Sequence, residues 1–326
     1  MKPYAAQLFS AGTFRWSSAS PLPSETDRLL VRTLVAAVCG SDLHVVDQGW
    51  GVRDLPADPG YPGHESIVEV LDDPSGTLPH GMRALAVPPA HDSRAFATHQ
   101  LVDRAALLPL EPDDAPTRMI FAQQLGTVIQ GLNVFWESSL RGLTVAVVGA
   151  GTAGTMFVHE AVRRGAAQVI VSDPDPHRRS VATAFGASSA VPAGELATTV
   201  SHETDEVGAP LVVEASGTDG GRNEAIASLR QDGVLGMFGL PQRLGPSPID
   251  IGALFARRAR LVTTHGTQSE PGLTAFREAL TQIRGQQFDP SLYTIATYPL
   301  SAVNAAFTAA RQRDRVHKAL LVAGSS

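Results

Sequence analysis

The feature that most constrains the fold is a glycine-rich turn between an apolar strand and a helical pattern. The strand "TVAVV" ends in G-x-G-x-x-G, formed by Gly149, Gly151 and Gly154, and "TMFVHEAVRRGA" follows with helical spacing. The first glycine of such a turn permits the bend, the second lets the backbone approach a pyrophosphate, and the third packs helix against strand. The helix start, with Thr152 and Ala153, offers unpaired N–H groups to the phosphates. This order of elements predicts a dinucleotide site.

Strands and helices alternate after this turn. The apolar runs "QVIVSD", "SAVP", "APLVVEASG", "VLGMFGLP" and "ARLVTTHG" are separated by helical patterns such as "PHRRSVATAFGA" and "GRNEAIASLRQDG". This alternation predicts a parallel sheet covered on both faces. The end of the chain predicts helix, helix and strand over "PGLTAFREALTQIRG", "YPLSAVNAAFTAARQ" and "KALLVAG". The first hundred or so residues, rich in Pro and Gly with short β-branched runs, predict a mostly β domain.

An acidic residue near the glycine turn bears on the choice of cofactor. Asp173 ends the next strand, 19 residues after Gly154 (173 − 154). A carboxylate at this place accepts hydrogen bonds from the ribose hydroxyls and repels a 2′-phosphate, which favours NAD over NADP. Two alternatives stay open. Arg178 could pair with a 2′-phosphate, and Asp173 could instead cap the helix that begins after Pro174.

Composition limits the remaining possibilities. A chain of 326 residues suggests two domains. A net charge of −6, without any basic run, argues against a nucleic-acid partner. No apolar run approaches the roughly 18 residues of a membrane span, and the N-terminus lacks the apolar core of a signal peptide. A single cysteine cannot form an intramolecular disulfide, so we expect a cytoplasmic protein.

That single cysteine stands in an unusual setting. Cys39 lies in "VCGSDLH", and His64 follows in "PGHE". Taken alone, Cys39 is as readily explained as a small buried hydrophobic residue. The alternative is that Cys39 and His64 bind one metal ion.

Together these motifs resemble the zinc-containing, medium-chain alcohol dehydrogenase family. The resemblance rests on "VCGSDLH", "PGHE", "VVGAGTAG", "VIVSD", "VVEASG", "MFGLP" and "YPLSAVNAAF…HKALLV", which together span nearly the whole chain. It implies an α/β protein with a β-rich, GroES-like catalytic domain, expected over 1–123 and 267–326. A doubly wound, parallel-sheet Rossmann domain that binds NAD is expected over 124–266. The resemblance also implies a small-molecule alcohol or ketone substrate and a homodimer or homotetramer.

The resemblance assigns a metal site residue by residue. Cys39 matches the cysteine ligand of a catalytic zinc, and His64 matches the histidine ligand. Glu65 matches a glutamate that lies beside the zinc or, in several bacterial members, binds it. Asp42 matches the acidic residue that supports the histidine ligand. A zinc ion with an open position polarises an alcohol oxygen and lowers its pKa.

The resemblance also assigns a proton relay and further cofactor contacts. Ser41 matches the hydroxyl that contacts the reacting alcohol, and His44 matches the histidine that passes the proton to solvent. Thr127, Gly239 and Leu240 match positions beside the nicotinamide cofactor.

The sequence departs from the family pattern in two places. The stretch "VPPAHDSRAFATHQLV" lacks the four cysteines that hold a structural zinc in many members, so we expect one catalytic zinc and no structural zinc. At the remaining ligand position stands Gln123, or Gln124 if the register slips by one residue. An amide oxygen is a poor zinc ligand, so we expect Glu65 to be the third protein ligand. Gln123 would then face the substrate, as in some glucose dehydrogenases of the family.

The sequence therefore predicts a zinc-dependent, NAD-linked dehydrogenase that acts on a secondary alcohol, of a polyol or sugar-like kind. One alternative is a zinc-free quinone or enone reductase of the same superfamily, but such proteins generally do not keep Cys39, His64 and Glu65 together. Another is a non-catalytic dinucleotide-binding protein, which would have little reason to hold Ser41 and His44 at relay spacing.

Overall fold

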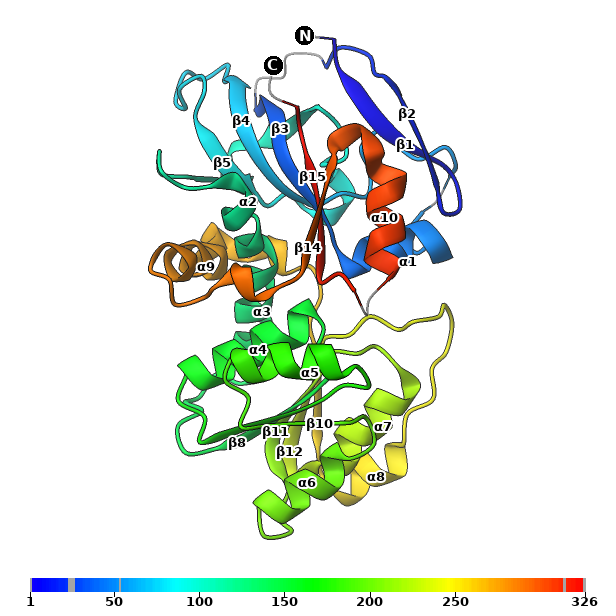
Figure 1. Cartoon of the computed structure of the whole chain (residues 1–326), viewed down its shortest axis with the longest axis vertical. Coiled ribbons are helices and arrows are strands. Elements are labelled where there is room, and N and C mark those ends of the chain that lie inside the picture. Colours follow the sequence, from blue (N-terminus) through cyan, green and yellow to red (C-terminus); the bar gives the residue numbers. More distant parts are fainter. Residues whose placement is uncertain (1, 23–26, 53, 313–314, 325–326) are drawn as a thin grey trace. The chain divides into compact units, whose positions relative to one another are not determined.

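The structure, a computed structural model, describes residues 2–22, 27–52, 54–312 and 315–324. The chain divides into two compact units. Unit 1 comprises Met1–Gly126 and Gln268–Ser326, and unit 2 comprises Thr127–Thr267. The sequence analysis placed these boundaries at 123/124 and 266/267. Both ends of the chain contribute to unit 1, whereas one continuous segment forms unit 2 (Figure 1).

Unit 1 is built on a seven-stranded sheet around its longest strand, β3 (Arg28–Val38). Buried and half-buried side chains alternate along the first part of β3, which is the two-residue period of a strand. β3 pairs antiparallel with β4 (Glu65–Asp72), β6 (His99–Asp103) and β15 (Lys318–Val322), so the C-terminal strand lies beside an N-terminal one. The sheet order is β14-β15-β3-β4-β5-β7, with β5 (Arg83–Ala86), β7 (Leu107–Pro109) and β14 (Ile295–Pro299) completing it.

The other elements of unit 1 cover this sheet. β1 (Tyr4–Ser10) and β2 (Thr13–Ser18) form a separate hairpin. The helices are α1 (Gly40–Gln48), α2 (Pro116–Met119), α9 (Thr274–Arg284) and α10 (Val303–Arg311), and α3 (Phe121–Phe135) crosses the boundary between the units. Short 3₁₀ turns lie at Ala90–Asp92, Arg104–Ala106, Thr267–Ser269, Pro271–Leu273, Pro290–Leu292 and Leu300–Ala302.

Unit 2 contains a six-stranded sheet with the order β10-β9-β8-β11-β12-β13, and all of its neighbouring strands are parallel. Its strands are β8 (Thr144–Val148), β9 (Gln168–Ser172), β10 (Ser189–Val191), β11 (Ala209–Glu214), β12 (Leu229–Met237) and β13 (Arg260–Thr263). The order reverses between β8 and β11. In open parallel sheets this reversal, at the carboxyl ends of the strands, is where ligands bind.

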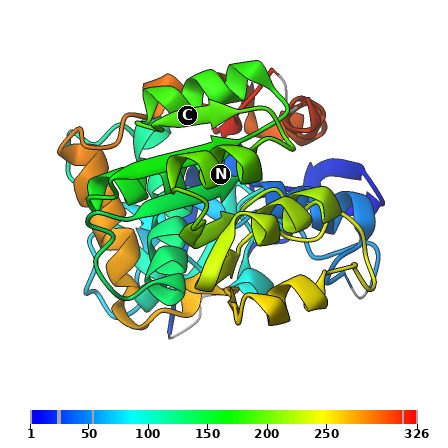
Figure 2. The ribbon, with the colours of Figure 1, turned by 90° about the horizontal axis from the view of Figure 1, so that it is seen from below.

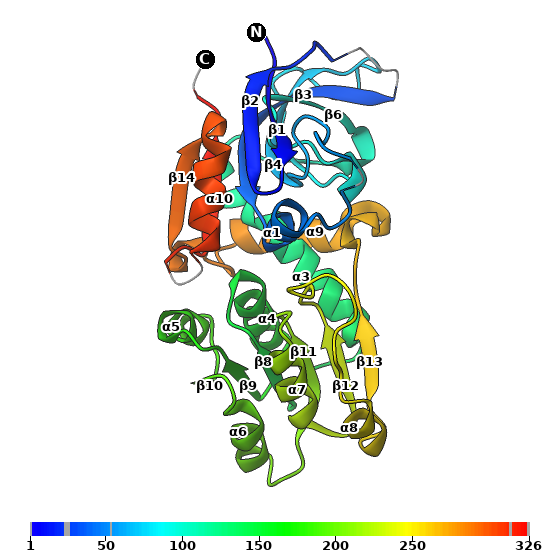
Figure 3. The ribbon, with the colours of Figure 1, turned by 90° about the vertical axis from the view of Figure 1, so that its right-hand side faces the viewer.

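Helices cover both faces of the unit 2 sheet. They are α4 (Thr152–Arg163), α5 (Pro176–Ala184), α6 (Leu196–Glu203), α7 (Asp219–Ala227) and α8 (Ile251–Ala256). α4 contacts α5, α6 contacts α7, and both pairs pack on the central strands. Figures 1 and 3 show the two pairs on opposite faces, and Figure 2 shows the same layers from below. The predicted doubly wound parallel sheet is confirmed.

Two sequence expectations were wrong. The helix expected over "GRNEAIASLRQDG" ends at Ala227, and strand β12 begins at Leu229. The reason is tertiary, because Leu229 pairs with Ala209 of β11 and lies in the core, which outweighs the local helical pattern. The end of the chain also contains a strand that the expectation of helix, helix and strand omitted. β14 lies between α9 and α10 and pairs parallel with β15.

None of the helices in the described part of the chain combines the length and apolar character that crossing a membrane requires.

The core of unit 1 joins the two ends of the chain through three aromatic rings. The Phe307 ring of α10 lies 5.0 Å from that of Phe14 and 5.5 Å from that of Phe96, between ring centroids. All three side chains are buried. The C-terminal helix therefore packs on residues that lie more than two hundred positions earlier in the sequence.

We predict that Phe307→Ala lowers the free energy of unfolding of unit 1 by about 3–5 kcal/mol, because it leaves a cavity in this cluster. Chemical denaturation followed by tryptophan fluorescence would measure the change. Leu55→Ala is the control, because Leu55 is 48% exposed in the same unit. Equal losses in the two variants would contradict the assignment of Phe307 to the core.

Candidate functional site

Helix α1 positions three of the predicted site residues. Cys39 is the N-cap, with an extended backbone at φ −91° and ψ 156°. Its thiol accepts the N–H of Asp42, and the carboxylate of Asp42 accepts the N–H of Cys39 at 2.9 Å, a reciprocal capping box. The helix ends at Gly49, whose φ of 74° suits glycine. The C-G-S-D motif thus places Cys39 at the helix start, with Ser41 and His44 one turn apart.

The structure brings the three predicted zinc ligands together. The ligand atoms of Cys39, His64 and Glu65 all lie within 4.8 Å of one another, the one such group of acidic, histidine and cysteine residues found in the described part of the chain. Nδ1 of His64 lies 2.9 Å from Oδ1 of Asp42. An imidazole that donates one N–H to a carboxylate leaves its other nitrogen available to a metal, and here that nitrogen is Nε2.

A buried lysine that the sequence analysis missed completes this cluster. Lys318 opens β15, is 3% exposed, and donates from Nζ to Oε1 of Glu65 at 2.8 Å. Its Nζ also lies 2.6 Å from the other Glu65 oxygen and donates to Oε1 of Gln124 at 2.9 Å. The sequence did carry a signal, because a lone lysine beginning the apolar strand "KALLV" is rarely buried without a partner.

The donor atoms of the cluster fit a divalent cation. Burial by itself lowers the pKa of His64 and of Lys318, but their acidic neighbours outweigh it. The pKa of Lys318 is raised, and that of His64 is raised well above its ordinary value. The cluster thus favours positive charge, and thiolate, imidazole and carboxylate are the ligands that zinc takes.

Other predicted catalytic residues lie near this cluster or within the same unit. Oγ of Ser41 lies 3.5 Å from Nε2 of His64, beside the ligand nitrogen. His44 is buried, and its ring meets that of Trp50 edge-on with centroids 6.4 Å apart. Gln123 is buried in α3. Its neighbour Gln124 is the glutamine that contacts Lys318.

In unit 2, the glycine turn has the conformation that the sequence pattern requires. Gly149 has a φ of +94°, which disfavours any other residue. A Cβ on Gly154 would lie 1.8 Å from the carbonyl oxygen of Gly149, so only glycine fits there. Gly151 is the N-cap of α4, and Thr152 and Ala153 are its first two residues. The helix therefore begins just after the carboxyl end of β8, and the N–H groups of a helix start are suited to binding an anion.

The acidic residue after β9 contacts the glycine turn directly. Oδ2 of Asp173 accepts the N–H of Ala150 at 2.8 Å, and Oδ1 accepts the N–H of Asp175 at 2.9 Å. The alternative role of Asp173 as a helix cap is wrong, because Asp175 caps α5. The helix begins at Pro176, two residues later than a cap at Asp173 would place it. Nη1 of Arg178 also lies by the turn, 3.5 Å from the position of a Cβ on Gly151.

The loop after β12 packs against the loop after β11. A Cβ on Gly217 would lie 2.0 Å from the carbonyl oxygen of Leu240, and a Cβ on Gly239 would lie 2.3 Å from the nitrogen of Gly217. Thr127 is the first residue of unit 2 and lies in α3. The sequence analysis missed Glu214, which closes β11 beneath these two loops; an acidic residue at the end of the apolar run "LVVE" was the available signal.

Known proteins share both the sequence and the fold. Residues 153–283 match the family described as zinc-binding dehydrogenase. The putative D-xylulose reductase of Agrobacterium fabrum is 26% identical over 72% of this chain and 74% of its own length. The sorbitol dehydrogenase of Bacillus subtilis is 25% identical over 68% of this chain and 71% of its own. The L-idonate 5-dehydrogenase structure from Escherichia coli superposes with a TM-score of 0.85 at 20% identity, covering 99% of this chain and 98% of that one.

Residues 153–283 thus match the zinc-binding dehydrogenase family, and the relatives and the fold support the zinc-containing medium-chain dehydrogenase family. The fold that the motifs predicted agrees with these comparisons. The group of candidate ligand atoms lies in unit 1 and the glycine turn in unit 2.

We predict that Asp42→Ala weakens zinc binding by about 10- to 100-fold, because Asp42 orients His64 and caps the helix that presents Cys39. Competition with a chromophoric chelator would measure the affinity. Asp47→Ala is the matched control, because Asp47 lies on the same helix but pairs with Arg311 at the surface. Zinc affinity that stays unchanged in Asp42→Ala would refute this role.

Proposed function

We propose that the protein is a zinc-dependent dehydrogenase that transfers a hydride between a secondary alcohol and NAD, giving the ketone or the reverse. The observation that carries the proposal is the convergence of Cys39, His64 and Glu65, with His64 held by Asp42. These three residues would bind one catalytic zinc. A structural zinc is not part of the proposal, because its usual ligands are four cysteines and the chain has one.

Zinc, when bound, polarises an alcohol oxygen and lowers its pKa. The chain's own residues then handle the proton. The hydroxyl of Ser41 lies beside the ligand nitrogen of His64, so it is placed to accept the proton of the alcohol. His44 lies one turn further along α1 and passes that proton to solvent, because an imidazole can accept and release a proton.

The glycine turn binds the dinucleotide in this proposal. Gly149, Gly151 and Gly154 let the pyrophosphate approach the N-terminus of α4, where Thr152 and Ala153 lie. Both carboxylate oxygens of Asp173 accept a hydrogen bond from a backbone N–H, and each oxygen keeps a lone pair for a ribose hydroxyl. Thr127, Gly239 and Leu240 contact the nicotinamide half.

The substrate in this proposal is a polyol or a sugar-like alcohol. The relatives named for sorbitol and D-xylulose support that class. Gln123 supports it too, because an amide at a usual ligand position is suited to a substrate hydroxyl, while Gln124 is engaged by Lys318. The zinc-free reductase and the non-catalytic alternatives both leave the Cys39, His64 and Glu65 group without a purpose.

The assembly we propose is a dimer formed across the edge of the unit 2 sheet, with pairs of dimers as a larger form. β13 is the edge strand, and its neighbourhood exposes apolar side chains: Ile251 is 64% exposed, Phe255 84% and Leu261 42%. The unpaired backbone groups of such an edge strand can pair with the same strand of a second copy of the chain. We also place the protein in the cytoplasm, where a reducing environment keeps the Cys39 thiol available to a metal.

The proposed function predicts that the purified protein holds about one zinc ion per chain and oxidises polyols with NAD⁺. Cys39→Ala should lose both the zinc and the oxidation while keeping its NADH affinity, because the thiolate lies in unit 1 and the glycine turn in unit 2. Elemental analysis, a panel of alcohols and NADH titration provide the three measurements. Activity in metal-free protein, or about two zinc ions per chain, would count against the proposal.

The position of Asp173 predicts a preference for NADH over NADPH, because a 2′-phosphate would meet its negative charge. Asp173→Asn keeps the shape of the side chain and an acceptor oxygen. It should therefore reduce the preference for NADH over NADPH while the glycine turn keeps its conformation. Arg178→Ala should weaken NADPH binding more than NADH binding. The dissociation constants of both cofactors test this prediction. If the unmodified protein binds NADPH more tightly than NADH, Arg178 and not Asp173 determines the cofactor preference.

A further inference from the structure

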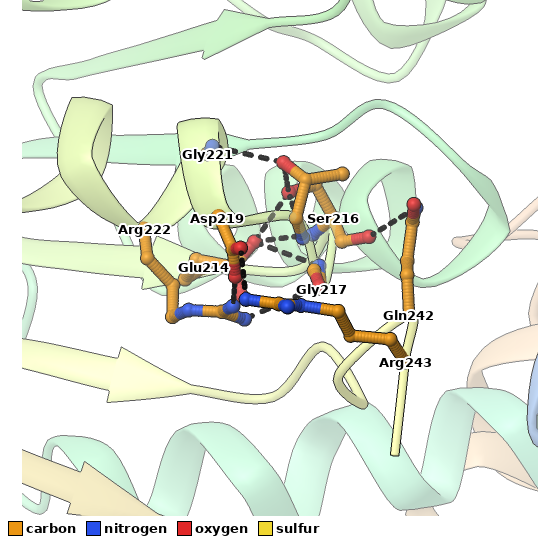
Figure 4. Close-up of polar contacts among 9 residues, drawn as sticks. Glu214, Ser216, Gly217, Asp219, Gly221, Arg222, Gln242 and Arg243 are labelled. Atoms are coloured by element: carbon orange, nitrogen blue, oxygen red, sulfur yellow. Dashed lines mark hydrogen bonds and ion pairs between the residues drawn. The ribbon is translucent and has the colours of Figure 1, made fainter. Parts of the chain in front are cut away.

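Strand β11 ends in a carboxylate that is fully buried and that none of the predicted roles uses. Glu214 is 0% exposed, and its Oε1 accepts the N–H of Ser216 at 2.7 Å and the N–H of Gly217 at 2.9 Å. The hydroxyl of Ser216 also donates to Oε1 (Figure 4). One oxygen atom therefore gathers three donors from the loop that follows its own strand.

The same loop is held from its other side by groups that bind its carbonyls. Nη1 of Arg222 donates to the carbonyl of Gly217 at 3.2 Å, and Arg222 is itself buried. Nε2 of Gln242 donates to the carbonyl of Ser216 at 3.3 Å. Asp219 pairs with both Arg222 and Arg243, which adds an ion pair between α7 and the loop after β12 (Figure 4). The loops after β11 and β12 are thus joined through side chains.

Glu214 also joins these loops through its backbone. Its carbonyl accepts the N–H of Phe238 at 2.9 Å and that of Gly239 at 2.8 Å. A Cβ on Gly149 would lie 3.0 Å from the nitrogen of Ser216. The glycine turn therefore packs on Ser216, and the loop after β12 bonds to Glu214 two residues earlier, on the carboxyl side of the strand-order reversal between β8 and β11.

The second carboxylate oxygen of Glu214 differs from the first. Oε2 has no hydrogen-bond partner among the described residues, although it is buried, and it lies 2.9 Å from the position of a Cβ on Gly239. Burial raises the pKa of the Glu214 carboxyl. All the side-chain hydrogen bonds of Glu214 thus use one oxygen, so an uncharged side chain of the same shape could form them.

We propose that Glu214 is a positioning residue of the dinucleotide site. Its hydrogen-bonded oxygen holds the loop after β11 beside the glycine turn, and Gly217 of that loop in turn packs on Gly239 and Leu240 after β12. The proposal rests on the dinucleotide site of the proposed function, and it assigns to Glu214 the placement of Gly239 and Leu240. It assigns no role to the negative charge.

The test compares NADH binding by the zinc-loaded protein and three variants, measured by NADH fluorescence. Glu214→Ala loses three hydrogen bonds, so we expect NADH affinity to fall at least tenfold. Glu214→Gln keeps an acceptor oxygen in place, so we expect affinity within about threefold of the unmodified protein. Glu160→Ala is the matched control. Glu160 is also 0% exposed and lies in unit 2, but it pairs with Arg163 and Arg164 toward the end of α4.

Thermal unfolding of each variant separates positioning from general damage. Glu160→Ala should lose stability and keep its NADH affinity, and zinc content should stay unchanged in all variants because the ligands lie in unit 1. If Glu160→Ala weakens NADH binding as much as Glu214→Ala, the effect is only structural and the proposal is overturned. A Glu214→Gln variant as weak as Glu214→Ala would overturn the hydrogen-bond role in favour of charge.

If Glu214→Ala does not fold, Ser216→Ala takes its place, because it removes only the hydroxyl donor. We then expect about a threefold loss of NADH affinity, and an unchanged affinity overturns the proposal. Failure of the unmodified protein to bind NADH or NADPH would overturn the proposed function together with this role. Normal binding by the unmodified protein with no loss in any Glu214 or Ser216 variant would overturn only the role of Glu214.

Discussion

The carboxylate of Asp42 is the interaction on which the metal site depends. Asp42 is 1% exposed, and its two oxygens bind different segments: Oδ2 accepts the N–H of Cys39, and Oδ1 contacts Nδ1 of His64. The first contact starts helix α1 at Cys39, and the second selects the nitrogen that His64 presents. The Asp42 side chain therefore holds Cys39 and His64, which are 25 positions apart (64 − 39), side by side in defined orientations. Without it, each ligand would have to be ordered separately.

The topology of unit 1 supplies the rest of the site. Strand β3 leads directly into Cys39, and its last residues pair with β4 on one side and β15 on the other. Glu65 lies opposite Ala37, and the first residue of β15, Lys318, lies next to the residue that pairs with Val38. The buried lysine therefore reaches the carboxylate because the C-terminal strand joins the sheet at this register. Lys318 and Glu65 are both buried, so each gives the other a partner of opposite charge within the sheet.

The sequence predicted what local chemistry determines and missed what distant pairing determines. The glycine turn is set by residues close in sequence, and its pattern was recognised. The helix cap at Cys39 is equally local but was not predicted. The partner of Glu65 is 253 positions away, so the lysine that begins "KALLV" indicated a buried pair but not the residue that it would meet. The same limit explains the error at Leu229, where pairing with β11 outweighs a helical pattern. A cap role was considered for Asp173, but Asp175 caps the helix. Both residues precede a proline, and only the backbone geometry distinguishes them.

The two sites use buried carboxylates in opposite ways. In unit 1, Asp42 and Glu65 lie where a cation would bind, and their charge is part of the site because it attracts that cation. In unit 2, the proposed ligand carries phosphates, and a charged carboxylate beneath the glycine turn would oppose its approach. Glu214 has a pKa raised by burial, and it offers one oxygen to three donors while the other has no partner in the described chain. Its hydrogen bonds therefore need an acceptor oxygen, which an amide of the same shape could also supply.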